Sequence, residues 1–154
     1  LQDTPESVAY QMISVLPTVP QISVLFDKIP ESHREVLKFW LSFWREHRDT
    51  LLTGALRADH PESLYSQVRM TGEGECIEIA YTDPVILLPT SENLYICNAT
   101  GAERICLIGI GEPQSRHITV RDCMGRVTEE RVAVIGCEST LFSVPCCGML
   151  ELTH

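Results

Sequence analysis

Long hydrophobic runs and lysine are both scarce in this chain, and the scarcity excludes two classes of protein. A membrane-spanning helix requires about 20 apolar residues, whereas the apolar run Val85–Leu88 ends after four residues at Pro89. Residues 56–154 contain no lysine, and the whole chain has 12 Lys and Arg against 21 Asp and Glu, a formal net charge of −9. We therefore expect no membrane association and no nucleic-acid binding, because both would need a basic face.

Cysteine is absent from the first 75 residues of the chain, and its later pattern does not fit disulfides or a zinc site. No two cysteines have the Cys-x-x-Cys spacing, and the total of seven is odd. Most lie among apolar residues, as in Ile105-Cys106-Leu107. We expect small, buried, free thiols, a pattern that slightly favours a reducing, cytoplasmic compartment. The cysteines are Cys76, Cys97, Cys106, Cys123, Cys137, Cys146 and Cys147.

Catalytic motifs are also missing. The sequence has no Gly-x-Ser-x-Gly nucleophile elbow, no His-Glu-x-x-His zinc helix and no phosphate-binding loop. Gly109-Ile110-Gly111 begins like a dinucleotide-binding fingerprint, but Gln114 stands where the third glycine would be. The sequence therefore predicts no catalytic, cofactor-binding or metal-ligating residue and no cofactor.

Asp27 and His47 each have a functional and a structural interpretation. Asp27 follows a short apolar run and could be one of the two carboxylates of a glycosidase, but aspartate is also typical of the turn that leads into the next helix. His47 lies on the apolar face of a predicted helix, where a packed histidine is more common than a base. We interpret both residues as structural.

The first half of the chain reads as helix, strand and helix. Residues 5–16 have a helical apolar stripe, with Asp3 or Thr4 as the cap. Residues 21–26 are mostly apolar and are typical of a strand buried on both faces. Residues 30–53 form a long amphipathic helix whose start is either Pro30 or a capping box of Ser32 and Glu35.

The apolar face of this long helix is unusually aromatic. Trp40, Phe43 and Trp44 lie on it together with His47. Such a face requires a large apolar partner surface. We expect the face to be buried against the chain's own β region or against a second copy in a homo-oligomer.

After residue 54 the hydrophobic period changes from 3.6 to 2. Short alternating segments separated by turn residues, at a spacing of about ten residues, are typical of an antiparallel β-sandwich of seven or eight strands. The predicted strands are 64–71, 75–82, 93–99, 104–110, 117–123, 128–135 and 149–153, with 140–144 as a weaker candidate. The predicted fold is mainly β with N-terminal helices.

Three runs of sequence together resemble a known family. They are Val19-Pro20-Gln21-Ile22-Ser23-Val24, then Phe26-Asp27-Lys28-Ile29-Pro30-Glu31-Ser32-His33, then Phe39 through Asp49 with Arg45-Glu46-His47-Arg48 near its end. They resemble the end of the catalytic barrel in bacterial melibiase-type α-galactosidases, glycoside hydrolase family 36 and its relatives, where an all-β C-terminal domain follows the last barrel helix.

The resemblance implies a division of the chain at residue 54. Residues 1–54 would be the last β–α unit of a (β/α)8 barrel, and residues 55–154 the C-terminal sandwich domain. The start at Leu1 without an initiator methionine agrees with a C-terminal fragment. The family's catalytic aspartates lie on earlier barrel strands, so no catalytic residue is carried over to this chain.

The resemblance implies a non-catalytic role, and two alternatives stay open. As a fragment, the chain would buttress the rest of the parent barrel, its main partner, and would hydrolyse nothing alone, the galactoside substrate binding only to the full-length enzyme. An independent carbohydrate-binding module would need exposed aromatic side chains, and after Trp44 only four aromatic residues remain: Tyr65, Tyr81, Tyr95 and Phe142. An unrelated structural domain would have its long helix packed on its own sheet.

Overall fold

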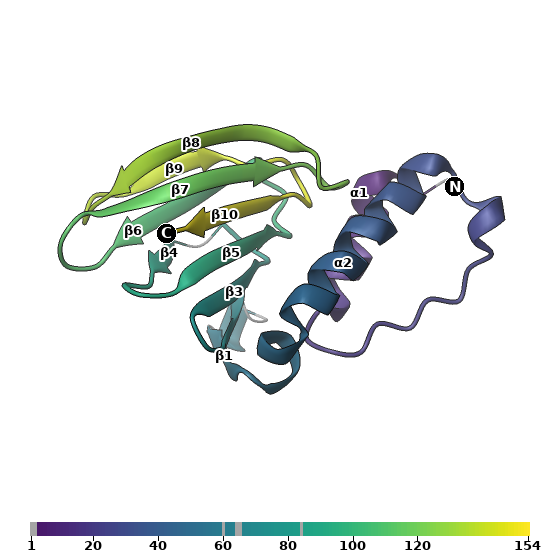
Figure 1. Ribbon diagram of the computed structural model, residues 1–154, viewed down its shortest axis with the longest axis horizontal. Helices are drawn as coiled ribbons and strands as arrows, with labels where there is room; N and C mark the ends of the chain where they lie inside the picture. Colours follow the sequence, from purple (N-terminus) through teal and green to yellow (C-terminus); the bar gives the residue numbers. More distant parts are fainter. Residues whose placement is uncertain (1–2, 60, 64–65, 84) are drawn as a thin grey trace.

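A computed structural model describes residues 3–59, 61–63, 66–83 and 85–154 of the protein. Within this part of the chain, two helices precede ten strands, and the strands form one seven-stranded sheet and one three-stranded sheet. In Figure 1 the helices lie beside one end of the strands. The fold is mainly β with N-terminal helices, as the sequence predicts. None of the described helices is long and apolar enough to cross a membrane.

The first helix, α1 (Pro5–Val15), forms where the apolar stripe predicts it. Thr4 is its N-cap, and the Thr4 hydroxyl accepts a hydrogen bond from the main-chain N–H of Ser7 at 3.2 Å. Pro5 occupies the first turn, where its missing N–H costs nothing. The buried stripe consists of Ala9, Met12, Ile13 and Leu16.

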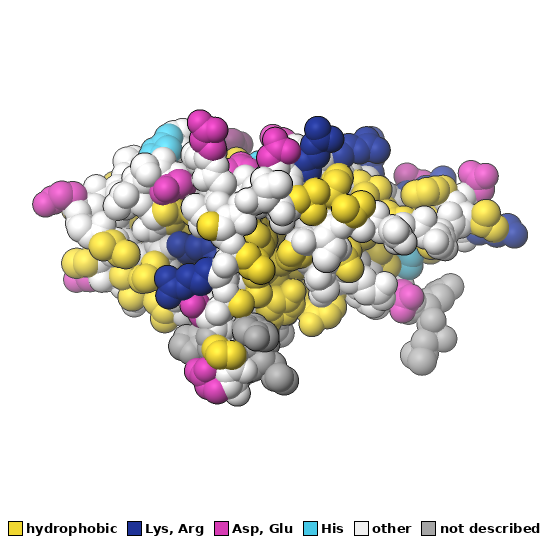
Figure 2. Space-filling view, turned by 90° about the horizontal axis from the view of Figure 1, so that it is seen from below, with side chains coloured by type: hydrophobic (Ala, Val, Ile, Leu, Met, Phe, Trp, Pro, Cys, Tyr) yellow, Lys and Arg dark blue, Asp and Glu magenta, His cyan; other side chains and the backbone are white. Residues whose placement is uncertain are grey.

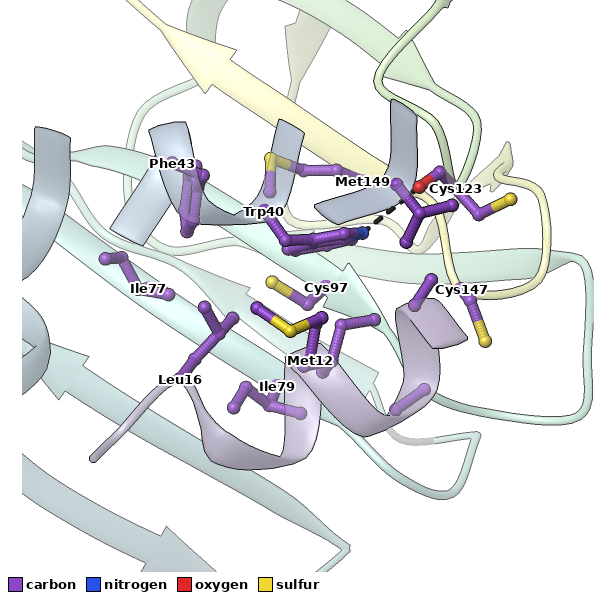
Figure 3. Close-up of a cluster of buried hydrophobic side chains, with 14 of the residues drawn as sticks. Met12, Leu16, Trp40, Phe43, Ile77, Ile79, Cys97, Cys123, Cys147 and Met149 are labelled. Atoms are coloured by element: carbon purple, nitrogen blue, oxygen red, sulfur yellow. Dashed lines mark hydrogen bonds between the residues drawn. The ribbon is translucent and has the colours of Figure 1, made fainter. Parts of the chain in front are cut away.

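The second helix, α2 (Glu31–Thr53), also agrees with the prediction. Pro30 is its N-cap and no side chain caps it, so neither a helical Pro30 nor a capping box is correct. At the other end, the N–H of Gly54 donates to Thr50 O. Trp40 and Phe43 of the aromatic face are buried in the core that the helices form with the chain's own sheet, as predicted, whereas Trp44 is only partly buried. Trp40 is fully buried, and its Nε1 donates to Cys123 O at 3.1 Å (Figure 3).

The predicted strand at residues 21–26 is wrong. Residues 21–25 are irregular, and Phe26–Lys28 form a 3-10 turn that leads into α2. A strand buried on both faces needs a neighbouring strand on each side. Within the described residues, no strand pairs with this segment. The last barrel unit expected in residues 1–54 is therefore not seen as a strand and a helix.

The large sheet has the strand order β1-β2-β3-β5-β10-β7-β8, and the small sheet has the order β4-β6-β9. The prediction of purely antiparallel pairing is wrong at two places, since β3 pairs with β5 and β4 with β6 in parallel. In sequence order the strands are β1 (Ala55–Asp59), β2 (Gln67–Thr71), β3 (Glu75–Ala80), β4 (Val85–Leu88), β5 (Asn93–Asn98), β6 (Arg104–Gly109), β7 (Gln114–Arg121), β8 (Val127–Ile135), β9 (Thr140–Ser143) and β10 (Met149–Thr153).

Eight of these strands coincide with predicted segments, and two were missed. The start of the segment predicted at 64–71 lies partly outside the described residues, and the strand itself begins at Gln67. The missed strands are β1 and β4. Every β1 residue but the last is exposed, and all four β4 residues are apolar, so neither segment alternates between apolar and polar residues in the sequence, although the burial of β4 does alternate.

Two hydrophobic cores lie on the two faces of the large sheet. The helix-side core fills the space between the helices and the sheet, and Figure 3 shows part of it around Trp40. The sandwich core lies between the large and small sheets. Central strand β3 contributes to both, with Ile77 and Ile79 facing the helices and Cys76 and Ala80 facing the small sheet. The helix-side core thus joins residues from both sides of the predicted boundary at residue 54.

Candidate functional site

A group of polar side chains lies beside two cavities where the C-terminal half of α2 crosses the large sheet. His47 comes from α2, Glu75 begins β3, Tyr95 lies on β5 and Glu151 on β10. We call these residues, with Thr50 and Arg121, the helix–sheet site. The register places Tyr95 opposite Glu151, so the side chains meet through strand pairing rather than through sequence proximity.

The centre of the site is a histidine–carboxylate pair. His47 Nδ1 lies 2.8 Å from Glu75 Oε2, and the Thr50 hydroxyl donates to Glu75 Oε1 at 2.5 Å. Both carboxylate oxygens of Glu75 are therefore engaged. The side chains of His47 and Glu75 are 6% and 20% exposed. Partial burial strengthens such polar contacts and makes the loss of either partner costly.

Aromatic rings enclose the imidazole of His47. Its centroid lies 4.4 Å from that of Phe43 and 4.6 Å from that of Tyr95, and the two outer rings are 5.9 Å apart in an edge-to-face arrangement. Because the ring of Tyr95 packs against His47 and Phe43, little of its surface is free to stack on a sugar.

Carboxylates dominate the electrostatics around Tyr95. Burial raises the pKa of the Tyr95 phenol, and the charges of Glu75, Glu151 and Glu46 raise it further. Glu151 in turn accepts a hydrogen bond from Arg121 Nε at 2.8 Å. The phenol therefore stays protonated and neutral at physiological pH.

Two hollows flank His47. One, of about 590 Å³, is lined by polar groups of α2 and of the β2–β3 turn, including Asp49, Glu73 and Glu75. The other, of about 280 Å³, lies between α2 and the sheet and includes Tyr95 and Glu151. Glycoside hydrolysis needs two carboxylates that face one sugar. Glu75 is held by His47 and Thr50, and Glu151 by Arg121, so neither is free for that chemistry.

Metal binding finds no support in the described residues. They include no group of three or more His, Cys, Asp or Glu side chains that could hold a metal ion. The seven cysteines are all free thiols, but the prediction that they are buried holds only for Cys76, Cys97, Cys123 and Cys147. Cys106 and Cys146 are partly exposed, and Cys137 is exposed. Burial raises the pKa of the Cys123 thiol to about 11 and, together with the neighbouring Cys146, that of Cys147 to about 12.

The residues weighed from sequence fall into structural positions. Asp27 is exposed in the 3-10 turn before α2, where the turn interpretation placed it. His47 is a packed, hydrogen-bonded histidine. Of the aromatic residues considered for a sugar platform, Phe142 is buried, Tyr81 and Tyr95 are partly buried, and Tyr65 lies outside the described residues.

Sequence reasoning missed Glu75, Glu151, Thr50 and Arg121. Glu75 follows the turn 72–74 and has no local feature that distinguishes it from other surface glutamates. Its partner His47 is 28 residues away. The only available signal was the placement of His47 on an apolar face, since a buried imidazole needs a polar partner.

Comparison of the chain with family models, with curated proteins and with solved structures finds no match. The family resemblance and the function it implies therefore continue as proposals.

Proposed function

We propose that this chain is the non-catalytic C-terminal part of an α-galactosidase-like glycoside hydrolase, with its division at residue 54, and that it buttresses the catalytic barrel of that enzyme. The proposal depends on one observation, the apolar segment between the two helices. It includes Val19, Val24, Leu25 and Phe26, of which Leu25 is 66% and Val19 63% exposed.

Exposure of this segment is costly in the chain alone. Burying one large aliphatic or aromatic side chain contributes about 1.5–3 kcal/mol, and four such side chains face solvent here. Clustered exposed apolar residues mark interaction sites. Figure 2, which views the molecule from below Figure 1, shows hydrophobic side chains gathered on this face.

A hollow beneath the segment extends the same surface. It measures about 390 Å³ and is lined by apolar residues of α1, of the segment and of α2, among them Met12, Ile22 and Leu37, together with polar residues such as Gln11 and His33. The segment and the hollow form one surface that another apolar body can cover. Neighbouring barrel strands would supply both the apolar cover and the main-chain partners that the segment lacks.

The helix–sheet site fits a supporting role. Glu75 is engaged by His47 and Thr50 of α2 and so fixes the helix on the sheet, whereas Glu151 pairs with Arg121 within the sheet. In the proposed enzyme α2 would link the barrel to the β region as one rigid unit. A homo-oligomer contact through the Trp40/Trp44 face stays a prediction, and it would fall on the partly exposed Trp44, since Trp40 is fully buried.

The decisive test is to read the sequence upstream of Leu1 in the same reading frame and to express the full protein that it encodes. We expect barrel strands that bear the two catalytic carboxylates, and hydrolysis of p-nitrophenyl α-galactoside by the full protein. The present chain alone should show no turnover. Measurable turnover by this chain, or an upstream sequence without a barrel, would refute the proposal.

A matched pair of variants sharpens the test. Leu25→Asp in the full protein should reduce activity and barrel stability, since it places a charge in the proposed interface. Val134→Asp changes a side chain of similar exposure, 66%, on edge strand β8 and should leave activity unchanged. Equal effects of the two variants would show that the segment has no special contact.

An independent module is the second candidate, because the helix-side core joins both halves of the chain in one body. Isothermal titration with galactose and melibiose separates a sugar-binding module from the fragment. Binding in the millimolar range or tighter would favour the module, whereas the packed state of Tyr95 and Phe142 leads us to expect none.

A further inference from the structure

Two consecutive cysteines, Cys146 and Cys147, lie side by side in the loop before β10. Their Sγ atoms are 3.8 Å apart. Successive side chains in an extended strand point to opposite faces. Cys147 is in the left-handed region, with φ of 57°, and is the one non-glycine residue with positive φ in the described chain. This turn of the backbone brings the two thiols to the same side.

The loop holds this geometry without a ligand. The N–H of Cys147 donates to Asn98 O at 2.8 Å, and the N–H of Gly148 donates to Pro145 O at 2.9 Å. The Asn98 side chain donates to Val144 O at 3.0 Å. Asn98 is itself fully buried. The two thiols are therefore preorganised, which reduces the entropy lost when one atom binds both.

Distances favour a bridging atom over a direct disulfide. Consecutive Cα atoms across a trans peptide are about 3.8 Å apart, less than the ~4.4–6.8 Å that disulfides prefer. The sulfurs would also have to approach from 3.8 Å to a bond length. By contrast, a pyramidal trivalent atom with bonds to sulfur of about 2.3 Å and a bond angle of about 100° holds two sulfurs roughly 3.5 Å apart. From 3.8 Å the thiols need only a small approach to reach that separation.

Zinc does not meet this requirement, because the described residues offer no third and fourth ligand. Trivalent arsenic that carries one organic group needs only two sulfurs, and soft thiols suit it. We propose that Cys146 and Cys147 form a chelating site for trivalent organic arsenicals. The proposal is independent of the proposed enzymatic origin of the chain.

The reaction balances without an oxidant. With phenylarsine oxide, two S–H bonds and the arsenic–oxygen bond break, two arsenic–sulfur bonds form, and both protons leave with the oxygen as one water. Arsenic stays trivalent. Cys146 is partly exposed and bonds first, and Cys147, which is 4% exposed, then closes the ring.

Trp40 provides an internal reporter of binding. Its indole N–H is bonded to Cys123 O, and Figure 3 shows Cys123 and Cys147 at the same end of the cluster around the indole. Arsenic bound to Cys147 would change the surroundings of Trp40. Tryptophan emission therefore reports occupancy, and intact mass spectrometry reports stoichiometry.

The test is titration of the fully reduced chain with phenylarsine oxide. We expect one adduct per chain that withstands excess glutathione, a monothiol, and is released by dimercaptopropanol, a dithiol. The second bond forms within the molecule, so affinity should exceed that of a single thiol by about 100-fold or more. Cys146→Ser should abolish the resistant adduct, and the serine hydroxyl can still donate to Thr100 O as the thiol does.

Controls keep the assignment falsifiable. Cys137→Ser, at an exposed lone cysteine, should retain the adduct in full. Unchanged tryptophan emission in the free variants shows that they fold. A resistant adduct that survives Cys146→Ser but is lost in Cys123→Ser would overturn the proposed pair, and the absence of any glutathione-resistant adduct in the native chain would overturn the site.

Discussion

The two cores differ in the side chains that fill them, although they share one sheet. The helix-side core is rich in sulfur, with Met12, Met70, Met149, Cys97, Cys123 and Cys147 around Trp40. Among the described residues, the sandwich core is almost entirely aliphatic, with Cys76 its one sulfur and Phe142 its one aromatic side chain.

Geometry explains the difference. Two sheets pack at a regular spacing, so alternating branched side chains interdigitate. A helix crossing a sheet leaves irregular gaps around its large side chains. Methionine, which is unbranched and flexible, fills such gaps. Composition therefore follows from the shape of each interface.

The largest expected effect comes from removing the centre of the helix-side core. Trp40→Ala should lower the free energy of unfolding by about 3–5 kcal/mol, because it creates a large cavity and leaves Cys123 O without its partner. Urea denaturation followed by circular dichroism measures it. Trp44→Ala, at a partly exposed residue, is the control and should cost less. Equal costs would contradict the central place given to Trp40.

A glycine in the β7–β8 hairpin tests how closely the sheet approaches the helix. Gly125 has φ of 83°, and an added Cβ would lie 2.3 Å from the Phe39 ring. Gly125→Ala should cost about 1–3 kcal/mol through overpacking, in addition to backbone strain. Gly74→Ala has a similar φ of 73° but open space around it, so it isolates strain alone. The difference in unfolding midpoint between the two variants therefore measures the cost of the steric contact with Phe39 of α2.

Loss of the contacts that Glu75 makes with His47 and Thr50 of α2 should lower stability by a comparable or smaller amount. Glu75→Ala removes the partner of His47 and of Thr50 and should cost about 1–3 kcal/mol. The exposed neighbour substitution Glu73→Ala should stay within about 0.5 kcal/mol. Thermal unfolding of both variants provides the comparison. A neutral Glu75→Ala would show that the pair does not fix α2.

Exchanging methionine and leucine in each core tests whether the two cores adapt equally well to a change in side-chain shape. Met149→Leu in the helix-side core should cost less than about 1.5 kcal/mol, because the surrounding sulfur-containing side chains can adjust. Leu94→Met in the sandwich core should cost more, since its neighbours are held in regular layers. The reverse order in denaturant midpoints would show that the cores are equally adaptable.

The smallest expected effect is a loss of folding stability that begins only above neutral pH. Burial raises the pKa of Cys123 to about 11 and, with Cys146 adding to it, that of Cys147 to about 12, from an ordinary 9.0. Above pH 9 the unfolded chain therefore loses thiol protons that the folded chain keeps, so stability falls as pH rises. Unfolding between pH 8 and about 11 checks this. The double variant Cys123→Ser, Cys147→Ser should reduce the decline, and the remainder comes from groups such as Cys97 and Cys76, whose pKa burial also raises. An unchanged decline would assign it to other groups.

The sequence predicted the elements with a clear local period. Both helices were found because their apolar stripes repeat every 3–4 residues, and eight strands because they alternate. The apolar segment at 21–26 was misread because composition alone does not show whether a neighbouring strand exists. Strands β1 and β4 were missed because β1 is exposed and β4 is a run of four apolar residues that does not alternate in the sequence.

The candidate site was only partly foreseen. The sequence placed His47 on a packed face, but its partner Glu75 becomes recognisable only when α2 lies across β3. The parallel pairing of β3 with β5 was equally hidden, since alternation in a strand says nothing about the direction of its neighbour.

Local patterning by itself determined the helices, most of the strands and the burial of an aromatic helix face, because hydrophobic period depends only on which side chains face water. Tertiary structure decided strand order, the direction of two pairings, the His47–Glu75 anchor and the approach of Cys146 to Cys147. Each of these depends on the position of the backbone in space, which is set by the packing of both cores together.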